Sequence, residues 1–349
     1  MIDEYNRQID YLRLSVTDRC NFRCIYCMPE TGVEFIEHNK ILTYDEIIIL
    51  CKIFKSIGIN KIRLTGGEPL VRKDIQELIY ALKNEVGMED IPLTTNAFFL
   101  KEQMQDLYNA GARKFNISLD AINKSTLQKI TRIQNIDNIF DGIDEAIKYR
   151  EKYKDVTIKI NTVPIKENKE EIIPLVRYAI NKQIPIRFIE LMPIGYGKNH
   201  ETLLESEIVQ IINTELSNEF GNLILDNDIN LKEKCRYYKF DNNSNTSKNP
   251  NASYNPKIGF ISSISHKFCK YCNRIRLTST GFLKTCLQFD YGVDLKKLLN
   301  EGKSEEEIKK EIIKAISNKP LSHHFGENND SNFTKEFIDE KKSMSQIGG

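Results

Sequence analysis

The feature that most constrains the fold of this chain is an alternation of strand and helix patterns over its first two thirds. Short apolar runs predict strands at 11–16, 61–66, 91–96, 114–120, 157–163 and 184–191. Amphipathic stretches between them predict helices at 43–57, 74–86, 100–109, 138–153 and 169–182. Strands separated by helices form parallel sheets with right-handed crossovers. The chain is therefore expected to form an α/β fold, either an open doubly wound sheet or a complete or partial barrel.

The residues of the strands favour a barrel. Polar and apolar side chains alternate along four of them, although parallel strands are usually apolar on both faces. A polar face shared by several parallel strands indicates a wet cavity between them, so we expect a barrel lumen that holds a polar substrate. The polar faces carry Arg13 and Ser15; Lys61, Arg63 and Thr65; Asn116, Ser118 and Asp120; and Lys159 and Asn161.

The pattern changes near residue 205. A helix is predicted at 205–218, the polar, turn-rich stretch 241–256 predicts a mobile loop, and a capping box predicts a helix at 304–316. A chain of 349 residues is long enough for two domains. We therefore expect a barrel domain over residues 1–220 and a smaller C-terminal domain over residues 221–349.

The formal net charge of the chain is +1, and its basic residues form no stripe. This composition argues against a nucleic-acid partner or a membrane surface, and no apolar run reaches the length of a membrane span. Residues 1–16 lack the pattern of a signal peptide, so we expect a cytoplasmic protein. Because thiols stay reduced in the cytosol, the eight cysteines are expected to bind metal or act in catalysis rather than form disulfides.

Six of the cysteines form two groups of three. The first group follows the first strand and the second lies in the C-terminal part: Cys20, Cys24 and Cys27, and Cys269, Cys272 and Cys286. A structural zinc site takes four ligands, whereas a [4Fe–4S] cube held by three cysteines keeps one iron open for another ligand. We therefore expect two [4Fe–4S] clusters, with zinc as the alternative. The cysteine spacing argues strongly against zinc in the first group and less strongly in the second. Cys51 is expected in the core, and Cys235 is given no role.

The C-x3-C-x2-C spacing after a first strand is the signature of radical S-adenosylmethionine (SAM) enzymes, and longer motifs make the resemblance more specific. They are LRLSVTDRCNFRCIYCMP, TGGEPLVR, TTNA, NISLD, RFIELMPIG, FCKYCNRIRLTSTGFLKTCL and the terminal Gly-Gly. Together they span nearly the whole chain and resemble the GTP 3′,8-cyclase (MoaA-type) family of molybdenum cofactor biosynthesis. The resemblance implies a partial (βα)6 radical SAM barrel with a smaller C-terminal domain that carries a second iron–sulfur site.

The resemblance also implies a role for each matching residue. The first cysteine group would hold a cluster whose open iron binds SAM, and the second a cluster whose open iron binds the guanine base. Contacts with SAM are implied for Tyr26, Gly67, Ser118 and Met192. Contacts with GTP are implied for Arg13, Arg63, Thr94, Lys159, Arg274 and Arg276, and the tail Gly348–Gly349 would enter the active site. No catalytic residue beyond the cluster ligands is implied.

Elementary chemistry agrees with several of these roles. Arg274 and Arg276 are spaced i, i+2, so they project together from an extended segment, and the arginine fork suits phosphate oxygens. Gly67 has no side chain to obstruct the methionine part of a ligand. Taken alone, a basic residue is more simply a solvated charge, Met192 a core residue and Gly-Gly a turn.

The implied enzyme is a radical SAM lyase with GTP as its substrate. A 5′-deoxyadenosyl radical takes hydrogen from C3′, the C3′ radical attacks C8 of guanine, and reduction with protonation gives (8S)-3′,8-cyclo-7,8-dihydroguanosine 5′-triphosphate. The implied partners are a reductant of the first cluster and cyclic pyranopterin monophosphate synthase (MoaC-type), which receives the product. The protein would be a monomer or a homodimer. Two departures from the family are Ala97, where glycine is typical, and a long 241–256 loop.

Two other functions fit part of the sequence. A different radical SAM reaction, such as peptide maturation, would use the C-terminal cysteines for an auxiliary electron-transfer cluster, but the basic residues suited to a triphosphate argue against it. A zinc-stabilised module that binds nucleic acid would use the same cysteines, but the near-zero net charge argues against it.

Overall fold

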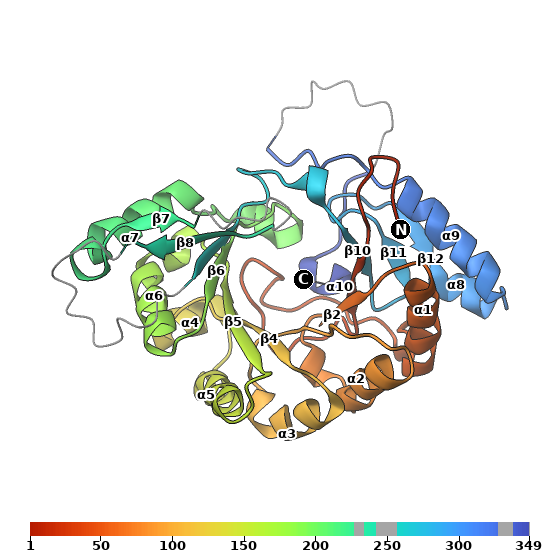
Figure 1. Ribbon diagram of the computed structural model, residues 1–349, viewed down its shortest axis with the longest axis horizontal. Helices are drawn as coiled ribbons and strands as arrows, with labels where there is room; N and C mark the ends of the chain where they lie inside the picture. Colours follow the sequence, from red (N-terminus) through yellow and green to blue (C-terminus); the bar gives the residue numbers. More distant parts are fainter. Residues whose placement is uncertain (227–233, 242–256, 327–337, 349) are drawn as a thin grey trace.

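The computed structural model describes residues 1–226, 234–241, 257–326 and 338–348 (Figure 1). Its strands form one sheet in the order β12-β11-β10-β1-β2-β3-β4-β5-β6-β9-β8-β7. Residues 242–256 lie outside the described residues, and with them nearly all of the segment that the sequence predicts as a mobile loop.

The six predicted strands form the centre of this sheet. They are β1 (Tyr11–Ser15), β2 (Lys61–Thr65), β3 (Leu93–Thr95), β4 (Lys114–Ser118), β5 (Thr157–Thr162) and β6 (Ile186–Ile189). Each pairs in parallel with the next, and their spatial order is their order in the sequence. A doubly wound sheet reverses its order at a switch point, whereas a barrel winds in one direction. The prediction of a barrel is therefore confirmed.

The helices that connect these strands lie on the outer side of the sheet (Figure 1). They are α1 (Tyr44–Ser56), α2 (Ile75–Asn84), α3 (Leu100–Ala110), α4 (Lys124–Thr131), α5 (Asp137–Lys152) and α6 (Ile172–Asn181). The predicted capping box starts α1, because the Thr43 hydroxyl accepts from Glu46 N at 3.2 Å and the Glu46 carboxylate accepts from Thr43 N at 2.7 Å. Short 3-10 turns occur at His38–Lys40, Pro69–Val71, Lys166–Glu171, Gly195–Asn199 and Cys269–Tyr271.

Later parts of the chain extend both edges of the central sheet. On one edge β10 (Arg274–Leu277) runs parallel to β1 and is followed by β11 (Phe282–Lys284) and β12 (Gly292–Asp294). On the other edge β9 (Ile258–Ile261) runs parallel to β6 and continues into β8 (Arg236–Phe240) and β7 (Leu223–Leu225). Among the described residues β12 and β7 end the sheet without pairing with each other, so the barrel is partial. The remaining helices are α7 (Glu205–Phe220), α8 (Leu295–Asn300), α9 (Glu305–Ser317) and α10 (Met344–Ile347).

The alternation read from the strands separates the core from the lumen. Leu12, Leu14, Ile62 and Leu64 are fully buried in the main apolar cluster, together with residues of the covering helices such as Phe54. The intervening positions carry the polar side chains. Strand register places Arg13 beside Arg276 on one side and beside Arg63 on the other, and the three arginines therefore form a row.

Candidate active site

Polar segments follow the carboxyl ends of the central strands. The cysteine loop follows β1, Gly66–Glu68 follows β2, Asn96 follows β3 and Asp120 follows β4. Carboxyl ends of parallel strands meet at one edge of a sheet, where α/β proteins place their active sites. The first cysteine group is thereby brought to the same end of the barrel as the segments that follow β2, β3 and β4.

The first cysteine group lies in the loop after β1. Cys20, Cys24 and Cys27 are free thiols and half-buried. Burial raises the pKa of the Cys24 thiol, and the nearby thiols of Cys27 and Cys20 raise it further. The guanidinium of Arg23 donates to the carbonyl oxygen of Cys20 at 2.7 Å and so fixes the turn. Three free thiols therefore lie within a single short loop.

The Gly-Gly-Glu segment supports this cysteine loop. Gly67 N donates to Thr17 O at 2.9 Å, and Glu68 N donates to Arg19 O at 2.8 Å. A Cβ on Gly67 would lie 2.4 Å from Arg19 O, which is too close for any side chain. In the structure, glycine at 67 is thus required by the backbone that leads to Cys20, whereas sequence reasoning attributed it to room for a bound ligand.

Glu68 is a buried carboxylate that joins the ends of two strands, and it was not predicted as a site residue. It accepts from Thr95 Oγ1 at 2.7 Å, Asn96 N at 2.7 Å and Leu70 N at 3.0 Å. Burial raises its pKa to about 7, and these hydrogen bonds oppose the rise. These hydrogen bonds join the loop after β2 to the end of β3.

The residues predicted to contact SAM are distributed over this end of the barrel. The Tyr26 hydroxyl donates to the carboxylate of Asp120, two residues after Ser118, which ends β4. Val163 N donates to the other oxygen of Asp120 at 2.8 Å, and burial raises the pKa of Asp120 to about 6. Met192 is half-buried and packs against a separate apolar cluster with the C-terminal segment.

The basic residues predicted to contact GTP converge in the lumen. Besides the row described above, Arg274 lies beside Tyr11 in the register of β10 and β1. Arg63 Nε, Thr94 Oγ1 and Arg274 Nε are buried atoms without a hydrogen-bond partner among the described residues. Buried polar atoms in folded proteins are nearly always hydrogen-bonded. A ligand rich in acceptor oxygens fits these donors.

The charges of the lumen point to the same ligand chemistry. Burial, with Arg274 nearby, lowers the pKa of Arg276 to about 10. Burial and the neighbouring Arg276 lower the pKa of Arg13 in the same way. Cations crowded together in a buried space repel one another, and a polyanion between them removes that cost.

Tyr11 is a lumen residue that sequence reasoning missed. Its ring centroid lies 5.1 Å from Lys61 Nζ, 5.7 Å from the Arg63 guanidinium carbon and 5.9 Å from that of Arg274. Burial raises the pKa of Tyr11, but the surrounding cations outweigh burial and lower it. The sequence could have predicted this position, because Tyr11 precedes Arg13 by two residues and therefore shares its strand face.

The opposite wall of the lumen carries Lys159. Strand register aligns Thr94 with Asn116 and Asn116 with Lys159, and Lys159 Nζ lies 6.0 Å from the Tyr237 ring. Arg187, which was also missed, donates from Nε to Asn161 Oδ1 at 2.9 Å and from its guanidinium to Asn116. A lone arginine in the apolar strand 184–191 was the signal that could have found it.

The second cysteine group lies next to this basic wall. Cys269 begins a 3-10 turn, Cys272 follows it, and Cys286 follows β11. Burial raises the pKa of Cys269, and the charges of Cys272 and Cys286 add to the rise. Burial also raises the pKa of Cys272, but Lys319, Lys234 and Arg274 outweigh it and lower the pKa to about 6. Both lysines come from segments whose sequence gave no signal of this contact.

The C-terminal tail reaches into the ring of strands (Figure 1). Gly348 has a φ of 81°, and a Cβ there would lie 2.8 Å from Ser15 Cβ and 3.1 Å from Thr65 Oγ1. Its carbonyl oxygen accepts a hydrogen bond from Arg276. Glycine therefore suits position 348 in both conformation and size. Gly349 lies outside the described residues.

The donor sets fit two iron–sulfur clusters. Among the described residues, no three His, Cys, Asp or Glu side chains are grouped so that they could hold one metal ion. A [4Fe–4S] cube instead takes one thiolate for each iron, and each cysteine group supplies three free thiols. The first group lies in the loop after β1, which contacts the segment after β2, and the second lies beside Arg274 of β10.

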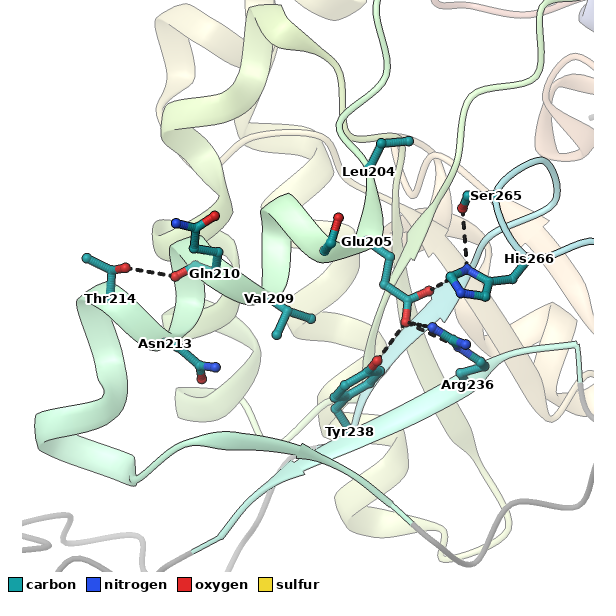
Figure 2. Close-up of a pocket in the computed structure, with 11 residues that line it drawn as sticks. Leu204, Glu205, Val209, Gln210, Asn213, Thr214, Arg236, Tyr238, Ser265 and His266 are labelled. Carbon is teal, nitrogen blue, oxygen red and sulfur yellow. Dashed lines mark hydrogen bonds and ion pairs between the residues drawn. The ribbon is translucent and has the colours of Figure 1, made fainter. Parts of the chain in front are cut away.

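A further pocket lies away from the lumen, between α7 and β8 (Figure 2). It has a volume of about 630 Å³, and none of the predicted site residues lines it. The Glu205 carboxylate accepts from Ser262 Oγ at 2.5 Å, from Tyr238 OH at 2.8 Å and from Arg236, and His266 lies 3.7 Å away. These contacts join α7 to β8 and to the segment after β9.

In the described part of the chain, no helix has the length and apolar character that crossing a membrane requires.

Comparisons with known proteins agree with the fold and the motifs. The family model of the Radical SAM superfamily matches residues 14–179, and that of Molybdenum Cofactor Synthesis C matches residues 184–325. A curated GTP 3′,8-cyclase of Clostridium perfringens (strain 13 / Type A) is 40% identical over all of both chains. That of Thermodesulfovibrio yellowstonii is 41% identical over 93% of this chain and 96% of its own.

A solved structure shares the fold. Streptococcus suis SuiB, bound to its precursor peptide SuiA, superposes with a TM-score of 0.58 at 14% identity, over 90% of this chain and 66% of that chain. The curated relatives confirm the resemblance seen in the motifs. The chain belongs to the GTP 3′,8-cyclase family of radical SAM enzymes.

Proposed function

We propose that this protein converts GTP into (8S)-3′,8-cyclo-7,8-dihydroguanosine 5′-triphosphate, the first step of molybdenum cofactor biosynthesis. The observation that carries the proposal is the lumen itself. Buried donors of Arg63, Thr94 and Arg274 without a partner among the described residues lie on barrel strands rich in cations, and a cysteine group lies beside Arg274. A triphosphate supplies the acceptor oxygens and the negative charge that these groups require.

The cysteines would hold two [4Fe–4S] clusters, the first on Cys20, Cys24 and Cys27 and the second on Cys269, Cys272 and Cys286. Reduced and with SAM bound, the first cluster would supply a 5′-deoxyadenosyl radical to take hydrogen from C3′ of GTP. The C3′ carbon would then bond to C8 of guanine, and one further electron from an external reductant and one proton would complete the product. Tyr26, Gly67, Ser118 and Met192 are the proposed SAM contacts.

The protein's own part in this reaction is to bind, orient and exclude water. Arg13, Arg63, Lys159, Arg274 and Arg276 would hold the triphosphate with Thr94. Held at several points, the nucleotide has its ribose and base fixed relative to both clusters, and such positioning lowers the entropic part of the barrier. Gly348 would close the lumen beside Ser15 and Thr65.

The surroundings of the reaction are part of the proposal. An external reductant would supply the electron to the first cluster, and the product would pass to cyclic pyranopterin monophosphate synthase (MoaC-type). We propose a cytoplasmic monomer or homodimer, with a boundary near residue 220 between barrel and C-terminal domain.

The deciding experiment uses anaerobically reconstituted protein with SAM and a strong reductant. We expect 5′-deoxyadenosine to form when GTP is added, with a matching loss of GTP, measured by chromatography. If 5′-deoxyadenosine forms to the same extent without GTP, the substrate assignment is overturned and a different radical SAM reaction is favoured. Stoichiometric zinc with little iron or sulfide in the purified protein would contradict both the proposed cyclisation and any other radical SAM reaction.

A further inference from the structure

The last described residues form a strap, residues 338–348, that pairs with residues 288–290 between β11 and β12 before it enters the lumen. Asp290 N donates to Ile338 O at 2.8 Å, and Glu340 N donates to Gln288 O at 2.6 Å. The side chain of Gln288 donates to Asp339 Oδ1 at 3.0 Å. Backbone and side-chain contacts therefore fasten the strap at its start.

A buried ion pair lies beneath this fastening. Lys284 of β11 binds the carboxylate of Glu340, and the two side chains are only 1% and 2% exposed. The second oxygen of Glu340 accepts from Lys342 N at 2.8 Å, and Asp290, which is half exposed, lies 3.7 Å from Lys284 Nζ. Removing one partner of a buried pair leaves an uncompensated charge, so the pair strongly favours the docked strap over a released one.

The other end of the strap contacts proposed site residues. A capping box of Ser343 and Gln346 starts α10, and Ile347 packs with Ile194 and Phe325. The next residue, Gly348, gives its carbonyl oxygen to Arg276. This hydrogen bond occupies one donor of the Arg276 fork and fixes the direction of the others.

We propose that Lys284 and Glu340 are positioning residues for GTP, because their ion pair holds the strap so that Gly348 aims the Arg276 fork into the lumen. The inference rests on the proposed function for the identity of the ligand. The fastening of the strap by the pair does not depend on that function.

The test uses full-length reconstituted protein carrying Glu340→Gln. Without GTP, we expect amide hydrogen exchange in residues 338–348 to rise by about a hundredfold, while β1 and β2 are unchanged. With GTP, the KM for GTP should rise by about tenfold while the KM for SAM stays the same, because one phosphate contact loses its orientation. If the wild-type protein leaves GTP unchanged, the proposed function is contradicted. The fastening of the strap is tested separately, because the exchange measurement needs no GTP.

The matched control is Glu205→Gln, which removes another buried carboxylate at a distance from the strap. It should leave exchange in residues 338–348 unchanged. Unchanged exchange in folded Glu340→Gln protein would overturn the proposal. If that variant fails to fold, Asp339→Ala, at an exposed position, decides instead: an increase of about threefold in strap exchange supports the fastening, and no increase overturns it.

Discussion

Buried donors without partners distinguish the residues of the lumen from those of the core. Arg63 Nε, Thr94 Oγ1 and Arg274 Nε find no acceptor among the described residues. Each such group costs the fold about 1–3 kcal/mol, and the cost disappears when a ligand supplies the acceptor. Both arginines lie near the Tyr11 ring, which limits the conformations they can take and so reduces the entropy lost on binding.

We expect Arg274→Ala and Arg276→Ala each to weaken GTP binding by about 2–3 kcal/mol, or roughly 30- to 150-fold, because each removes a charge-assisted contact to phosphate. Anaerobic titration calorimetry of the reconstituted protein measures the change. Arg150→Ala is the control, since this arginine lies on α5 and binds the carbonyl oxygens of Gln183 and Lys182. Equal affinity in all three variants and the wild type would refute the assignment of the lumen.

Single residues also show how much of the candidate site can be predicted from the sequence. Strand alternation and motif resemblance both led to Arg13 and Arg63, since a local period of two decides which face a strand residue takes. Lys234 and Lys319 could not be predicted, because their place beside Cys272 depends on packing between segments far apart in the chain. Ala97 has a φ of 65°, so the position adopts the left-handed conformation even where alanine replaces glycine.

Among the secondary-structure elements, the contact between β2 and the cysteine loop determines where the first cysteines lie. Gly66 and Gly67 approach the backbone of Thr17 and Arg19 so closely that only glycine fits. A short motif after a strand can therefore act on a metal site that it does not ligate.

We expect Gly67→Ala to lower the iron and sulfide content and the 5′-deoxyadenosine yield by at least about tenfold, because its Cβ would displace Arg19 and the loop that carries Cys20. Iron and sulfide analysis after reconstitution measures this. Gly87→Ala is the control, since its Cβ meets nothing within 4 Å and its φ of 74° costs only local strain. Full cluster content in Gly67→Ala would show that the loop can move aside.

Glu205 links α7 to the strands at the other edge of the sheet, and its charge should make that link depend on pH. Burial raises its pKa, but hydrogen bonds from Ser262, Arg236 and Tyr238 outweigh burial and lower it below 4.5. A lowered pKa stabilises the fold above about pH 4.5, and this contribution is lost as the pH falls further.

We therefore expect Glu205→Gln to reduce the free energy of unfolding by about 2 kcal/mol at pH 7, with the difference from wild type shrinking below about pH 4. Urea denaturation of protein freed of iron, at both pH values, measures the difference. If the difference in the free energy of unfolding between variant and wild type does not change with pH, the charge of the Glu205 carboxylate does not stabilise the contact of α7 with the strands.

The elements were predicted unevenly, for a physical reason. The helices α1 to α3, α5 to α7 and α9 were clear because long periodic patterns report local burial, and the strands β1 to β6 were found between helix patterns of this kind. The helix α4 and the strands β7 to β12 were missed, because these short elements lie in irregular sequence without a regular alternation of strand and helix around them.

For the molecule as a whole, the sheet places two cysteine groups that are far apart in sequence at opposite ends of two neighbouring strands. The first follows β1 and the second flanks β10, and these strands are neighbours. The six cysteines could be predicted as ligands from their spacing, but their common lumen required the pairing of β1 with β10, which no local pattern reveals.

We expect the wild-type protein to hold about eight irons per chain and Cys269→Ser to hold about four to five. Cys269→Ser should still cleave SAM but form no cyclised product, because the second group serves GTP rather than SAM. Iron analysis and chromatography of both products test this division. Equal loss of both activities in a variant that retains the first cluster would contradict it.

The pairing of β1 with β10 also affects how the chain is made. The ribosome completes β1 early, yet the strand that covers its outer edge is synthesised about 260 residues later. At roughly 5–20 residues per second, the apolar Leu12 and Leu14 lie in an uncovered edge strand for about 13–50 s. An open edge recruits other strands. The first strand that this protein completes is thus among the last to be protected, and its yield in a cell should depend on chaperones that attend the nascent chain.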